Sequence, residues 1–219
     1  MVEWLGDLTL FKISGFITVF ITLMGVILPW VVYRGREGEK YSFLNHFISE
    51  LGERGVSRWA WISNLCIIIS GVGVIISTIS LGLGLPGFWA KLGLLFGVVT
   101  GLGLMMVGIF PMDNIKPHAT AAVTFFRGGL LMVSAFSLAI LFPLQNNVII
   151  SRSFGLIGLI PTAAFITFLG LLWKERDHVD QTLTTEGMRH ARISKFAISE
   201  WAVFLSIILW VLVLSLAIE

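Results

Sequence analysis

Residues 10–33, "LFKISGFITVFITLMGVILPWVVY", decide the fold, because they form a long apolar run in which Lys12 is the one charged side chain. About 20 consecutive apolar residues are needed to cross a bilayer as a helix. Backbone amides in lipid must find hydrogen-bond partners within their own segment, so runs of this length are expected to be helices. Five more such runs follow, at about 59–83, 87–111, 118–142, 150–173 and 196–218. The sequence predicts an all-α polytopic membrane protein, a six-transmembrane helix bundle.

The composition agrees with this fold class. Apolar residues make up 56% of the chain and charged residues only 13%, whereas soluble domains carry about 25% charged residues. The mean hydropathy is +0.91. Basic residues lie beside acidic ones and form no continuous stripe, which argues against a nucleic-acid partner. No linker interrupts the pattern, so residues 1–219 are predicted to form a single transmembrane domain.

Basic residues also predict the orientation of the bundle. Of the 15 Lys and Arg residues, eleven fall between spans one and two, three and four, or five and six, and only three fall on the opposite side. Because Lys and Arg prefer the cytoplasmic side, the protein is expected in the cell membrane with long loops 34–58 and 174–195 in the cytoplasm. Both termini are then expected outside.

The first of these loops has a helical pattern. Phe43, Phe47 and Leu51 are spaced four residues apart, as on one face of a helix. This spacing predicts a short interfacial helix over residues 41–51, with His46 and Glu50 on a neighbouring face. The two side chains could equally form an ordinary surface pair.

A second polar segment stands between spans three and four. Pro111 and Pro117 frame a turn that contains Asp113, and His118 opens the fourth span directly after the second proline. Asp113 and His118 are predicted to lie on the same membrane face as the first loop.

Four side chains are therefore candidates for catalysis: His46, Glu50, Asp113 and His118. Two imidazoles and two carboxylates are suitable for general acid–base work, and the same four are suitable ligands for a divalent metal such as zinc. No established metal-binding spacing is present. A purely structural hydrogen-bond cluster is the competing interpretation.

Arg127 is the most unusual residue of the fourth span. It follows His118 by nine residues, which places it about 13 Å deeper along a helix. A charge at this depth needs a partner, and Glu200 in the sixth span is predicted to supply it. Arg127 and Glu200, with Asn64 and Ser49, are the candidate ligand-binding residues for an anionic group. The alternative is a structural ion pair that fixes helix register.

The third span carries a stripe of small residues, Gly93, Gly97 and Gly101. Glycines at this spacing let helix backbones approach closely. The stripe predicts either tight packing within one chain or the seam of a homo-oligomer.

Three short motifs resemble a known family. They are "ISELG" at 48–52, "GIFPMD" at 108–113 and "HATAAVTFF" at 118–126. They are similar to the integral membrane family called domain of unknown function 998. The resemblance is more distant to the FRAG–DRAM–Sfk group, which includes a factor that remodels the lipid of glycosylphosphatidylinositol anchors. The matching positions are Ser49, Glu50, Gly52, Gly108, Pro111, Asp113 and His118. The resemblance implies six helices and a lipid-linked role.

The sequence thus predicts a membrane protein with a polar cavity at one face that binds or remodels a lipid or another anionic amphipathic ligand. Membrane lipids are its expected partners. The chain is also weakly similar to intramembrane zinc hydrolases of the ceramidase type. Three alternatives stay open: an intramembrane metal-dependent hydrolase, a small-solute transporter and a scaffold without a ligand. Enzymatic activity is left open with them.

Overall fold

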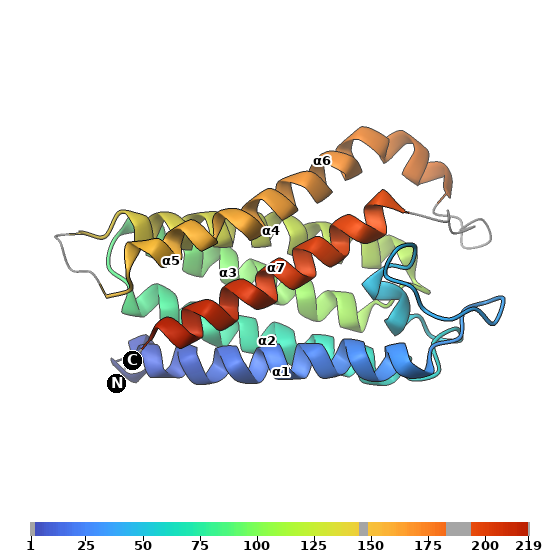
Figure 1. The fold of residues 1–219 in the computed structure, drawn as a ribbon, viewed down its shortest axis with the longest axis horizontal. Coiled ribbons are helices and arrows are strands. Elements are labelled where there is room, and N and C mark those ends of the chain that lie inside the picture. Colours follow the sequence, from blue (N-terminus) through green and yellow to red (C-terminus); the bar gives the residue numbers. More distant parts are fainter. Residues whose placement is uncertain (1–2, 145–148, 183–193, 219) are drawn as a thin grey trace.

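Six long helices joined in an up-and-down order make up the protein in its computed structural model (Figure 1). The structure describes residues 3–144, 149–182 and 194–218. In chain order the elements are η1 (Glu3–Gly6), α1 (Leu8–Val32), η2 (Ile48–Gly52), α2 (Ala60–Gly84), α3 (Phe88–Ile109), α4 (Ile115–Leu141), α5 (Arg152–Ile157), α6 (Leu159–Thr182) and α7 (Lys195–Ala217).

The predicted six-span all-α bundle is confirmed. Six helical stretches are long and apolar enough to cross a membrane, and α5 with the first part of α6 forms the fifth of them, Arg152–Lys174. The helix α6 continues beyond this span to Thr182, so residues 174–182, predicted as loop, are helical. The remainder of that predicted loop, residues 183–193, lies outside the described residues.

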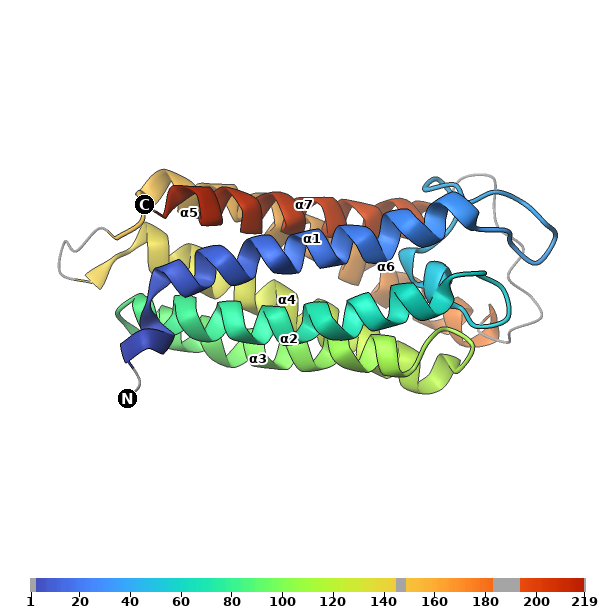
Figure 2. The ribbon, with the colours of Figure 1, turned by 90° about the horizontal axis from the view of Figure 1, so that it is seen from below.

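The spans form a closed ring around a common interior. Each of the helices α1 to α4 packs against the next, α4 packs against α6, and α6 packs against α7. The last helix α7 then returns to α1 and closes the ring, as Figure 2 shows from below. Every span therefore contributes one face to the interior.

Small residues bring α2 and α3 into close contact. A Cβ atom built on Gly101 would lie 2.5 Å from Ile75 and 2.7 Å from the carbonyl oxygen of Gly71, both in α2. One built on Gly97 would collide with Thr78, and one on Gly93 with the ring of Phe136 in α4. The stripe is therefore used for packing within the chain. The alternative, a seam between copies of the chain, stays a prediction.

The loops gather at one end of the bundle, called here the loop end. The segment between α1 and α2, the turn between α3 and α4, and the ends of α6 and α7 that face each other lie there (Figure 1). Both termini lie at the opposite end. The grouping agrees with the pattern expected from the basic residues, while the cytoplasmic placement of this end stays a prediction.

Candidate functional site

The segment between α1 and α2, residues 33–57 and called the cap here, folds inward over the loop end. It contains a short helix, as predicted, but η2 covers only Ile48–Gly52 and is a 3-10 helix. The predicted helix over residues 41–51 is therefore wrong for its first seven residues. Glu50 accepts a hydrogen bond from the backbone N–H of Phe47 at 2.7 Å, a donor that a continuous helix would use itself. Phe43 and Leu44, in the part that is not helical, are exposed.

Two helices hold the cap in place through buried polar groups. The backbone N–H of Ile48 donates to Oε2 of Glu200 in α7 at 2.7 Å. The side-chain amide of Asn64 in α2 donates to the carbonyl oxygen of Gly52 at 2.9 Å. Asn64 was predicted to bind a ligand. In the structure its amide positions the cap through this hydrogen bond.

The turn between α3 and α4 makes two further contacts with the cap. Arg54 forms an ion pair with Asp113 at 2.9 Å. Partial burial raises the pKa of Asp113, but hydrogen bonds from Arg54 and its charge outweigh burial, so that the pKa lies below its usual value. Ser49 donates to the sulfur of Met112 at 3.5 Å. Asp113 is thus engaged by an arginine at the surface.

His46 and Glu50 belong to an aromatic network inside the cap. The His46 ring lies 5.5 Å from the ring of Tyr33 and 5.2 Å from that of Tyr41. Its Nε2 lies 3.6 Å from Glu39. The Tyr33 hydroxyl donates to Glu50 at 3.4 Å, and burial, followed by the nearby carboxylates, raises the pKa of Tyr33. Tyr33 therefore stays a protonated donor, and the network holds the cap together.

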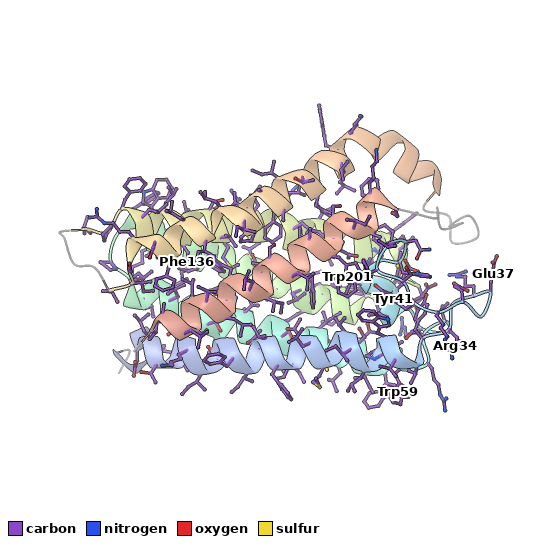
Figure 3. All side chains as sticks on the ribbon, viewed as in Figure 1. Arg34, Glu37, Tyr41, Trp59, Phe136 and Trp201 are labelled. Atoms are coloured by element: carbon purple, nitrogen blue, oxygen red, sulfur yellow. The ribbon has the colours of Figure 1, made fainter. Side chains whose placement is uncertain are left out.

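Trp201 links this network to α7 and was missed in the sequence. Its indole N–H donates to the Tyr41 hydroxyl at 3.2 Å, and its ring lies 5.8 Å from that of Trp30. Figure 3 shows Tyr41 and Trp201 together at the loop end. A signal for the aromatic network was available, because Tyr33 and Tyr41 are the chain's only two tyrosines and lie only eight residues apart, at the end of the first span and in the first loop.

A cavity of about 170 Å³ lies in the interior of the ring, beneath the cap. It extends along α1 from Phe11 to Val26, roughly 22 Å at the rise of a helix. Leucine, isoleucine, valine and phenylalanine side chains from the surrounding helices form most of its wall; those from α7 include Val203, Phe204, Ile207, Ile208 and Val211.

The hydroxyl groups on this wall are already satisfied by the helices that carry them. Thr18, Thr22 and Thr100 each donate to the carbonyl oxygen four residues earlier, at 2.7 Å. Ser77 shares a hydrogen bond of 2.8 Å with Ser14 of α1. Bonded in this way, the threonine hydroxyls have no hydrogen left to donate to a ligand, and most of the cavity surface along its length is apolar.

Polar groups line the cavity at its loop end, where Ile48 and Ser49 of the cap meet His118 and Glu200. His118 is buried, and its Nδ1 lies 2.9 Å from the carbonyl oxygen of Phe110. Since a carbonyl only accepts, we assign the ring hydrogen of the neutral His118 to Nδ1, which leaves Nε2 as an acceptor. Ser49 and Glu200 thus occupy the cavity wall that they were predicted to share.

The four predicted catalytic residues do not form one cluster. His46 and Glu50 lie within the cap, Asp113 pairs with Arg54, and only His118 lines the cavity. In the described part of the chain no group of three or more His, Cys, Asp or Glu side chains could hold a metal ion. The structure therefore does not bring these four side chains to one shared site, and both carboxylates have partners of their own.

Arg127 lies outside the cavity, with an exposed side chain on the outer face of α4. No ion pair joins it to Glu200 among the described residues, and Glu200 accepts from Ile48 instead. The predicted pair is wrong for a geometric reason. Nine residues make about two and a half helical turns, so Arg127 faces away from the interior that His118 faces.

Comparison with known protein families places the chain in one of them. A family model described as "Protein of unknown function (DUF998)" matches residues 16–217. No curated protein and no solved structure matches the chain. The resemblance carried by the three short motifs is thereby confirmed at the level of the family, whereas the similarity to the FRAG–DRAM–Sfk group is not shown.

Proposed function

We propose that this chain, which belongs to the DUF998 family, binds an amphiphilic molecule of the membrane inside its helix ring. The hydrocarbon part of the ligand would occupy the apolar cavity, and its polar head would lie at the loop end beside His118, Glu200 and Ser49. The single observation that carries the proposal is a long, mostly apolar cavity whose titratable lining side chains, His118 and Glu200, lie at the loop end.

The chemistry of the wall supports a hydrocarbon ligand. An apolar cavity enclosed by leucine, isoleucine and phenylalanine side chains excludes water and accepts apolar molecules. Because the hydroxyls of Thr18, Thr22 and Thr100 are bonded to their own helices, the wall imposes little desolvation cost on an alkyl chain.

The cap supports a defined position for the head group. Ile48 and Ser49 form its contact with the cavity, and Glu200 fixes Ile48 through a partly buried hydrogen bond. A rigid polar end orients an amphiphile, as a few placed polar groups do in other ligand sites. The excess of Lys and Arg in the loops supports a cytoplasmic position for this end.

Replacing Val74 with phenylalanine is expected to abolish ligand retention. Val74 of α2 lines the cavity, so the larger ring would occupy space that the ligand needs. The lipids that copurify with the protein would be counted by native mass spectrometry after mild delipidation. Occupancy should fall by at least about tenfold, which corresponds to ~1.4 kcal/mol.

Val72→Phe is the matched control, because Val72 lies two residues away on the same helix and is exposed on the outer surface. It should retain the ligand at the level of the natural sequence. Equal retention by both variants, with both folded, would contradict a ligand in the interior.

A further inference from the structure

The charge on the cavity wall points to a particular class of head group. Glu200 is the one carboxylate among the described residues that line the cavity, and no lysine or arginine joins it there. Arg127, expected to anchor an anion, faces outward. An anionic head would therefore find no basic partner on the described wall, an arrangement that is costly in a water-poor interior.

Glu200 is held with one oxygen free. Its Oε2 accepts the 2.7 Å hydrogen bond from the backbone N–H of Ile48, which fixes the carboxylate against the cap. Within the described part of the chain, no donor reaches its Oε1. The side chain is thus both positioned and able to accept a further hydrogen bond.

The neighbouring polar groups of the wall also accept hydrogen bonds. His118 directs Nδ1 to the carbonyl oxygen of Phe110, which leaves Nε2 as an acceptor in the neutral ring. Ser49 uses its hydrogen toward the sulfur of Met112, so its oxygen lone pairs stay available. Three acceptors at the polar end thus call for a head group rich in donors.

We infer that the cavity selects a single-chain primary amine in its protonated form, an inference that rests on the proposed function. An ammonium group carries three donors, no acceptor and a positive charge. It would meet an acceptor on each of Glu200, His118 and Ser49, and its positive charge would hold Glu200 in the ionised form. A hydroxyl head has one donor and no charge, and a carboxylate head has neither a donor nor the required sign.

Head-group selectivity is tested with three ligands of equal chain length: dodecylamine, dodecanol and dodecanoic acid. They would compete at equal concentration for the protein in phosphatidylcholine nanodiscs near neutral pH, with bound ligand counted by native mass spectrometry. The amine should be bound at least about tenfold above either competitor. Since all three share one tail, differences in occupancy report on the head.

The variant Glu200→Gln should remove most of this preference. Its amide oxygen can still accept from Ile48, which keeps the cap in place, while the negative charge is lost. Arg127→Leu is the control and should retain the full preference, because Arg127 lies outside the cavity.

Two failures are distinguishable. If dodecanol or dodecanoic acid binds as well as the amine, or if Glu200→Gln keeps the preference, the amine is the wrong class although the cavity still binds amphiphiles. If no ligand is retained, and Val74→Phe behaves like the natural sequence, the proposed function itself falls. The competition between the three ligands uses the protein of natural sequence. It can therefore contradict the inference even if Glu200→Gln does not fold.

Discussion

Leu51→Ala is expected to lower the free energy of unfolding by about 2–5 kcal/mol, the range measured when large buried side chains are truncated. Leu51 is fully buried in a small core beneath the cap. Its partners there are Val26, Tyr33, Tyr41, Ile48 and Trp201. The cavity left by the missing methyl groups would loosen the contact between the cap and α7. Unfolding by denaturant in detergent micelles, followed by tryptophan fluorescence, measures the change.

Leu44→Ala provides the comparison within the same loop. Leu44 is exposed, so its truncation should change stability by less than about 0.5 kcal/mol. The backbone carbonyl of Leu44 accepts from the N–H of Ser194 at 2.8 Å, and this bond is unaffected by the substitution. A Leu51→Ala protein as stable as Leu44→Ala would mean that the cap is not a packed element.

Gly101→Ala is the second substitution with a large expected effect. In a helix interior this change normally stabilises by up to about 1 kcal/mol. At Gly101 the added methyl group would lie 2.7 Å from the backbone oxygen of Gly71, which cannot move unless α2 moves. Overpacking of this kind costs about 1–3 kcal/mol, so the net effect should be clear destabilisation, measured by the same denaturant titration.

Gly170 of α6 supplies the matched position. A Cβ atom built there meets nothing within 4 Å. Gly170→Ala should therefore be neutral or slightly stabilising, as helix propensity alone predicts. If both alanine variants showed the same stability, close packing of α2 on α3 would not hold the ring together.

The six spans could be predicted from the sequence because their cause is local. A run of about 20 apolar residues must form a helix in lipid, and this holds whatever the neighbours are. The cap could not be predicted in the same way. The spacing of Phe43, Phe47 and Leu51 favours a helix, but the bond from Phe47 to Glu50 and the docking of Ile48 on Glu200 compete with it. These contacts depend on α7, far along the chain.

The candidate site was predicted in part. His118, Ser49 and Glu200 do line one cavity, although they come from three different segments. Arg127 was placed at the right depth and on the wrong face, because depth follows from residue number while the face follows from helical phase. Arg127 follows His118 by nine residues, or about two and a half helical turns, so the opposite face could have been predicted from the sequence. Linear spacing says nothing of partners, and so the roles of Asn64 and Asp113 needed the packed structure.

The most direct test of an amphiphile inside the ring is photolabelling with a dodecylamine that carries a diazirine near the end of its chain. Labelled positions on α7 would be mapped by peptide mass spectrometry. A chain in the cavity should label the inward-facing Val203 and Ile207. Labelling confined to Leu205 and Leu209, which are exposed on the outer surface of the same helix, would place the amine in the surrounding lipid and contradict the account.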